Sequence, residues 1–125
     1  MNDAIGTRLV EAIAARDRES LAACFAADAD FRALIPPGLR ERTGAGDASE
    51  IVMSWFADAT ELELVRSHVE TVGDRLHVAY NFRGVEEGEP FVVEQQLYCE
   101  TSDGKIVSAS LLCSGFRPPA EPAER

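Results

Sequence analysis

The chain has 125 residues, of which 46% are hydrophobic and 27% are charged, and its formal net charge is −10. This length suits one domain with a single core. The acidic balance argues against nucleic acid and membrane surfaces as partners, because phosphates are met by clustered Lys and Arg, and no basic run occurs. The apolar stretches are also far shorter than the ~20 residues of a membrane-spanning helix.

The three cysteines, Cys24, Cys99 and Cys113, lack the spacing of a metal site and are an odd number, which is typical of reduced thiols. The N-terminal residues alternate polar with apolar instead of building the apolar core of a secretory signal. Glycine patterns that cradle phosphates are missing as well. We therefore expect a cytoplasmic protein without a metal or a cofactor.

Two helices are predicted at the start of the chain. Residues 3–16 place Ile and Leu at helical spacing. Residues 17–29 begin with Asp17, a good N-cap, and place Leu21 and Phe25 on one face. Cys24 is expected to pack on that face as a small hydrophobic residue.

A short strand and a third helix follow. Residues 30–35 form the predicted strand, and Pro36-Pro37-Gly38 ends it because two prolines cannot continue a ladder. A loop then runs to Gly46. Residues 48–59 carry one apolar stripe, which includes Trp55, and are predicted to be helical.

The hydrophobic period changes to two after residue 60, which predicts strands. Four strands, at residues 61–72, 75–84, 90–101 and 105–116, are joined by turn sequences and form an antiparallel meander. Helices followed by consecutive strands are typical of an α+β fold with the helices on one face of the sheet. We predict one domain over residues 1–117 and a flexible proline-rich tail over residues 118–125.

This element order resembles the nuclear transport factor 2-like superfamily and its SnoaL-like members. The resemblance rests on LAACFAADADFRA (residues 21–33) and SDGKI (residues 102–106) and covers residues 3–117. It implies a cone-shaped, curved antiparallel sheet wrapped around the N-terminal helices, a cystatin-like α+β barrel with an apolar pocket open at one end. It also implies a homodimer formed through the outer sheet face. Because the same cone hosts isomerases, cyclases, dehydratases, epoxide hydrolases and binding modules, the fold alone does not choose among them.

Strand alternation predicts which side chains enter the pocket of such a cone. Gln95 both donates and accepts hydrogen bonds, so it suits orienting a carbonyl or hydroxyl; the alternative is a bond to a buried neighbour. Tyr80 is either a ligand contact or a core aromatic residue whose hydroxyl bonds a buried neighbour. The predicted pocket residues are Trp55, Leu76, Val78, Tyr80, Phe82, Gln95, Leu97, Cys99, Leu111 and Cys113.

The catalytic groups of ketosteroid isomerase, the best-known enzyme on this cone, are missing. That enzyme uses a tyrosine, a carboxylate base and a protonated acid. The resemblance places Leu9, Ala33 and Leu97 at those positions, so no isomerase activity by that mechanism is expected. The acid that SnoaL-like cyclases carry near the last strand is not visible either. Epoxide hydrolases on this cone use two aspartates bridged by an arginine in the pocket. Arg66 could face inward, but no inward aspartate pair can be placed beside it.

Three residues remain as weak catalytic candidates: His68, Tyr80 and Cys113. The apolar residues before and after His68 do not share one pattern of alternation, so a bulge is expected there and His68 could face either side of the sheet. His77 alternates with the apolar residues of its strand and should face outward. Cys113 does not fit the C-x5-R phosphate loop, because Arg117 is only four residues away. It should instead lie beside Gln95, out of reach of a disulfide with Cys99.

The leading hypothesis is therefore a homodimeric domain that binds a small, largely apolar organic ligand. The first alternative is a cofactor-independent isomerase, cyclase or dehydratase acting on a small hydrophobic or polyketide-like substrate. The second alternative is an interaction module that binds a partner protein through the outer sheet face. The hairpin acids Glu86, Glu87 and Glu89 are interpreted as a solvated turn.

Overall fold

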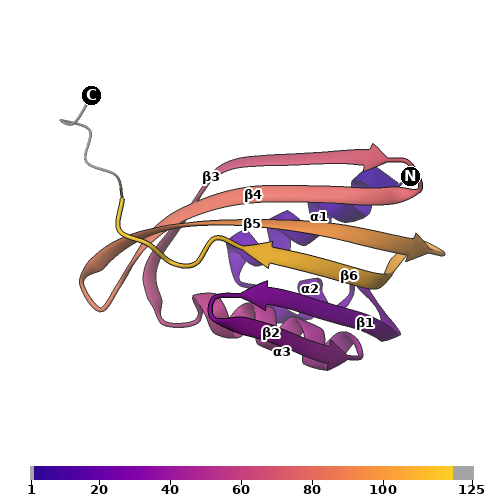
Figure 1. Ribbon diagram of the computed structural model, residues 1–125, viewed down its shortest axis with the longest axis horizontal. Coiled ribbons are helices and arrows are strands. Elements are labelled where there is room, and N and C mark those ends of the chain that lie inside the picture. The colour runs from indigo at the N-terminus through magenta and orange to yellow at the C-terminus, as the bar shows by residue number, and fades with distance from the viewer. Residues whose placement is uncertain (1, 120–125) are drawn as a thin grey trace.

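The computed structural model describes residues 2–119 and has an α+β fold, as predicted (Figure 1). Helices lie against one face of a single curved sheet of six strands, in the order β2-β1-β6-β5-β4-β3. The elements are α1 (Asn2–Ala15), α2 (Arg18–Ala22), β1 (Phe25–Ile35), β2 (Gly38–Thr43), α3 (Ala45–Phe56), β3 (Ala59–Val72), β4 (Arg75–Glu86), β5 (Glu89–Ser102) and β6 (Lys105–Cys113).

The sheet is mixed and open. Strands β3 to β6 form the predicted antiparallel meander. Strand β1, however, pairs with β6 in the parallel direction, so the expectation of a purely antiparallel sheet is wrong for this pair. Strands β2 and β3 stand at opposite ends of the sheet order, so the sheet curves around the helices without closing into a barrel.

The second helix is shorter than predicted. It begins after the Asp17 N-cap, whose carboxylate accepts a hydrogen bond from the Ser20 N–H as expected, but it ends at Ala22. The alanine-rich residues that follow favour a helix locally, yet the backbone from Phe25 onward is a strand. The Cys24 carbonyl accepts from the Ile106 N–H, so pairing with β6 overrides local helix propensity here.

The predicted loop after Pro36-Pro37 is a strand. Strand β2 pairs antiparallel with β1 across this turn, in which the Pro36–Pro37 peptide is cis. All its residues but the first are exposed, so the sequence carries no alternation that could have revealed it. At the other end of the chain, β6 stops at Cys113 and not at the predicted residue 116.

The core fills the concave side of the sheet. Leu9 and Ile13 of α1 and Phe56 of α3 are fully buried against inward residues of the strands. None of the described helices is long and apolar enough to cross a membrane. Of the predicted tail, Pro118 and Pro119 are exposed, and residues 120–125 lie outside the described residues.

Candidate functional site

A buried hydroxyl–amide pair lies at the centre of the concave face. The Tyr80 hydroxyl on β4 donates to Gln95 Oε1 on β5 at 2.6 Å. The Gln95 Nε2 donates in turn to Cys113 Sγ at the end of β6, at 3.5 Å. Burial, followed by the nearby Cys113 and Cys99, raises the pKa of Tyr80 well above its usual value. Tyr80 therefore stays a neutral hydroxyl at ordinary pH.

The inward direction predicted from alternation is confirmed for the strand residues. All nine strand residues of the predicted pocket are buried, whereas Trp55 on α3 is only partly buried. Gln95 and Cys113 are register partners, as expected. Whether these side chains contact a ligand stays a prediction.

Aromatic rings connect this buried pair to one end of the sheet. Ring centroids are 5.5 Å apart for Tyr80 and Phe82, and 5.3 Å for Phe82 and Phe56. From Phe56 the contacts continue to Phe116 at 5.7 Å, and from Phe116 to Phe91 at 5.2 Å. A continuous row of rings thus runs from the core to the surface.

The row ends at a cavity of about 590 Å³, which we call the mouth cavity. It lies between the end of α3, the hairpin that joins β4 to β5, and the segment after β6. Its volume suits a small organic molecule, since ligand pockets measure roughly 300–1,000 Å³. The lining residues are Ile35, Trp55, Glu86, Glu89, Pro90, Phe91, Phe116, Arg117 and Pro118.

Most of these lining residues were missed by sequence reasoning. Glu86 and Glu89, interpreted as a solvated turn, are register partners at the end of the hairpin. Continuing the alternation two residues at a time from Phe82 and from Phe91 would have placed both carboxylates on the concave side. Phe116 was placed in the predicted strand 105–116, where alternation from Cys113 turns it outward; this was wrong because β6 ends at Cys113.

His68 lies on the outer face of the sheet. Its side chain is 58% exposed, and its Nε2 is 3.2 Å from Glu70 Oε1. His77 stacks on Tyr98 on the same face and bonds Gln96 Oε1 at 2.9 Å, so its predicted outward direction is confirmed. The predicted bulge exists, but a base role for His68 inside the cone loses its geometric support.

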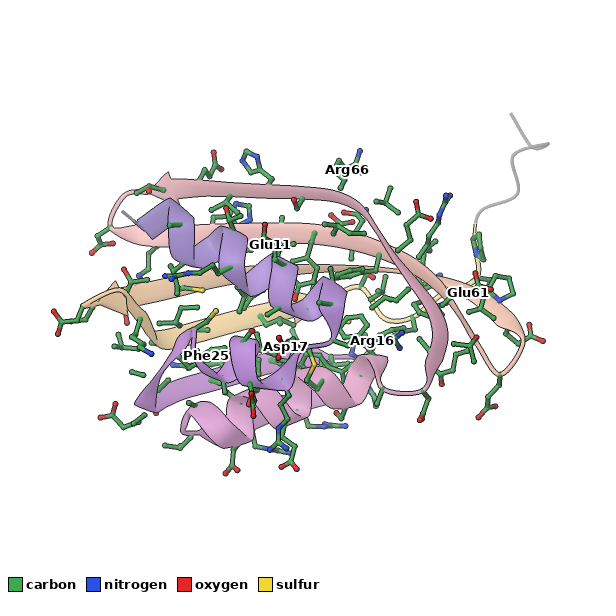
Figure 2. All side chains as sticks on the ribbon, turned by 180° about the vertical axis from the view of Figure 1, so that it is seen from behind. Glu11, Arg16, Asp17, Phe25, Glu61 and Arg66 are labelled. Atoms are coloured by element: carbon green, nitrogen blue, oxygen red, sulfur yellow. The ribbon has the colours of Figure 1, made fainter. Side chains whose placement is uncertain are left out.

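The Glu70 carboxylate lies between the two histidines. A hydrogen bond from His68 is the largest of several contributions that lower the pKa of Glu70. Arg66 is exposed and points away from the helices, so it gives no support to an epoxide hydrolase site (Figure 2).

The three cysteines are free and buried. Burial raises the pKa of Cys99 to about 12 and also raises that of Cys24. Cys99 is the register partner of Ala109 and Cys113 that of Gln95, so the expected separation of the two thiols along the strands is confirmed.

Buried acid–base groups are scarce. Among the described residues, Ser49 and Gln95 are the buried polar side chains apart from the Tyr80 hydroxyl, and no carboxylate or histidine is buried with them. The described part of the chain also holds no group of three or more His, Cys, Asp or Glu side chains that could bind a metal ion. General acid–base chemistry therefore has no buried carboxylate or imidazole to use.

An open, curved sheet around helices, with polar groups inside and a cavity at one end, defines the α+β cone domains with a ketosteroid isomerase-like fold. A model of the SnoaL-like domain family matches residues 7–109. The chain therefore belongs to the SnoaL-like domain family.

Solved structures agree on the fold. A protein with a ketosteroid isomerase-like fold from Catenulispora acidiphila, solved with trimethylamine, is 20% identical with TM-score 0.72 over 89% of this chain and 85% of its own. A proposed polyketide cyclase from Xanthomonas campestris is 20% identical, with TM-score 0.68 over 90% and 92%. A proposed isomerase from Rhodopseudomonas palustris is 21% identical, with TM-score 0.65 over 92% and 93%. No protein with a curated description matches this chain.

Proposed function

We propose that this domain binds a small, largely apolar organic molecule that enters through the mouth cavity. The observation that carries the proposal is the row of aromatic rings from Phe91 and Phe116 to Tyr80, because it connects a cavity of ligand size to buried polar groups. Apolar walls supply affinity, and few polar groups then fix the orientation of the ligand.

The hydroxyl–amide pair would provide that orientation. The Tyr80 hydroxyl donates a hydrogen bond to Gln95, so its oxygen can still accept one from a ligand. Gln95 uses one of its N–H groups on Cys113 and retains the second. The pair thus offers one acceptor and one donor, which matches a hydroxyl or carbonyl group on an otherwise apolar molecule.

An enzyme is the second candidate function. Solved neighbours are described as an isomerase and a polyketide cyclase, and Glu86 and Glu89 place two carboxylates beside the mouth cavity. A carboxylate there could move a proton on a bound substrate, which would suit an isomerase, cyclase or dehydratase without a cofactor. Leu9, Ala33 and Leu97 offer no support for the ketosteroid isomerase mechanism.

We further propose that the protein works as a homodimer in the cytoplasm. Three unpaired thiols suit a reducing compartment. Exposed apolar side chains on the outer sheet face suit a second copy of the chain, although the same face would also suit a different partner protein.

Trp55 provides the test, because it is the single tryptophan and lines the mouth cavity. Prodan, a neutral fluorescent naphthalene ketone, should quench Trp55 emission saturably. Ile35→Glu adds a charge to the cavity wall and should weaken binding about tenfold or more, as an unpaired polar group disfavours an apolar ligand. Val72→Glu, at an exposed position far along β3, is the matched control. Equal affinity of both variants, or no quenching at all, would contradict the proposal.

A further inference from the structure

The segment after β6, residues 114–117, runs alongside β5 and lines the mouth cavity with Phe116 and Arg117, and we call it the strap. Two backbone hydrogen bonds tie its end to β5, from Val92 N to Arg117 O at 2.8 Å and from Arg117 N to Val92 O at 3.0 Å. The Ser114 N–H donates to the Glu94 carbonyl at 2.9 Å. The strap is thus an interrupted extension of β6, attached at its two ends.

The middle of the strap turns one aromatic side chain inward. Gly115 has a φ of +87°, a conformation that glycine adopts without strain. Phe116 follows and packs on Phe56 and Phe91, although 37% of its own surface is exposed. Phe56 and Phe82 behind it are fully buried. The Phe116 ring therefore stands between the mouth cavity and the interior row of rings.

The attachment of the strap differs from that of the strands around it. Strand β6 has a register partner on β5 for nearly every residue, whereas the strap has one isolated bridge and two hydrogen bonds between Ser114 and Glu94. Ser114, Phe116 and Arg117 are all exposed. Segments with few buried contacts and exposed hydrogen bonds open locally far below the free energy of global unfolding.

We infer that the strap is a gate, and that Phe116 is a plug which must leave the interior before a ligand reaches Tyr80 and Gln95. The inference rests on the proposed function and adds how the access of the ligand to the interior is controlled. Release at Val92 and rotation at Gly115 would withdraw the ring, and the exposed backbone groups would then bond water. A bound apolar molecule takes the place of the ring against Phe56.

A reversible cross-link tests the gate. Residues that exchange two backbone bonds in an antiparallel pair have Cα atoms about 5.5 Å apart, which is within disulfide range. The double variant Val92→Cys/Arg117→Cys should therefore lock the strap when oxidised. Val92 is exposed and faces opposite to the inward Phe91 and Val93. Arg117 lines the mouth cavity, so the reference for the locked form is the same double variant after reduction, which has the same side chains without the link.

The locked form should bind prodan at least about tenfold more slowly than the same protein after reduction, because only the open fraction admits ligand. The two single variants, which carry the same side-chain changes without the link, should each bind at the same rate in both redox states. Phe116→Ala removes the plug and should bind faster than the wild type. Equal binding rates in the locked and reduced forms would overturn the gate and leave the proposed function standing.

Cys113 gives a readout that needs no ligand. Its sulfur accepts the Gly115 N–H at 3.4 Å, so opening the strap uncovers it. Alkylation of Cys113 by iodoacetamide, followed by peptide mass spectrometry, should be slower in the locked form and faster in Phe116→Ala, with buried Cys99 as the internal control. If the lock changes this rate but no form binds prodan, the strap moves and both the binding function and its gating are overturned.

Discussion

At the scale of single residues, the central feature is the hydrogen bond between Tyr80 and Gln95 inside a largely apolar core. A buried hydroxyl or amide costs free energy unless it has a hydrogen-bond partner. The hydrogen bond between the two side chains offsets the free-energy cost of burying each of them. No buried side-chain polar atom among the described residues lacks a partner. The pair is therefore compatible with a folded core as well as with ligand orientation, and mutation can measure how strongly the two residues are coupled.

Tyr80→Phe should destabilise the protein by about 1–3 kcal/mol, because it leaves the Gln95 Oε1 buried without its donor. The double variant Tyr80→Phe/Gln95→Met replaces both partners by apolar groups of similar size. It should lose less stability than the sum of the two single variants, since no polar group is then stranded. Urea unfolding of the four proteins measures this coupling, and additive losses would show that the hydrogen bond contributes nothing specific.

Cys99 should make the stability fall in alkaline solution. Its pKa is raised by burial from 9.0 to about 12, so above pH 9 the unfolded thiol ionises while the folded thiol keeps its proton. The folded state then binds more protons, and stability decreases with rising pH between about 9 and 12, by up to about 1.4 kcal/mol per pH unit for this group. Below pH 9 the contribution is fully present.

Cys99→Ala tests the alkaline dependence, because it removes the titrating group. The variant is expected to be less stable at neutral pH owing to the cavity that it leaves. Its free energy of unfolding should nevertheless fall less steeply than that of the wild type across the alkaline range. Tyr80 and Cys24 have raised pKa values too, so part of the slope should persist. Parallel curves for the two proteins would exclude Cys99 as a cause.

At the scale of elements, Arg16 joins the end of α1 to the end of α3 (Figure 2). Its Nη1 donates to the Phe56 carbonyl at 3.2 Å and to the Ala59 carbonyl at 2.6 Å. It also has a positive φ of 53°. Because an L residue is disfavoured in that conformation, the side-chain contacts stabilise a turn that the backbone alone would avoid.

Arg16→Ala should therefore cost about 1.5–3 kcal/mol, the range for hydrogen bonds from a charged donor. Alanine at this position keeps the same backbone strain, so the change isolates the side-chain bonds. Arg18→Ala removes an exposed arginine whose ion pair with Glu50 spans 3.9 Å, and it should change stability by less than about 0.5 kcal/mol. Thermal unfolding compares the two, and equal effects would argue against the anchoring role of Arg16.

The elements also show which features the sequence could predict. Helix α1 and the meander of β3 to β6 follow from periodicity, because each has an apolar face that is buried or, in β3, half-buried. Strand β2 was missed because five of its six residues are exposed. The start of β1 was missed because a run of alanines favours a helix locally, and only pairing with β6, some eighty residues away, decides otherwise.

At the scale of the whole molecule, some residues of the candidate site could be predicted from the sequence and others could not. Tyr80, Gln95 and Cys113 were found by alternation, since a strand fixes which face each side chain occupies. Of the residues that line the mouth cavity, Trp55 was predicted and the others were not, because tertiary closure brings the end of α3, a hairpin and the strap together. Phe116 lies beyond β6 on no regular element, so the alternation of the predicted strand gave the wrong direction for its side chain.

The outer face of the sheet carries the last prediction, a homodimer. Leu34, Leu39 and Leu112 are 50%, 55% and 50% exposed, and Leu34 is the register partner of both others. Three leucines thus form one apolar patch across β2, β1 and β6. Apolar patches of this kind mark interaction surfaces, and a second copy of the chain brings an identical patch to cover it.

Charge opposes this association, so salt should strengthen it. Each chain carries a formal charge of −10, and added salt screens the repulsion between two copies without weakening apolar burial. Sedimentation equilibrium should show a dimer whose dissociation constant falls as salt rises. Leu112→Glu puts a carboxylate from each copy into the patch and should give monomers, whereas Val72→Glu on the opposite edge strand should not. A monomeric wild type at high salt, or a dimeric Leu112→Glu, would place the interface elsewhere or exclude it.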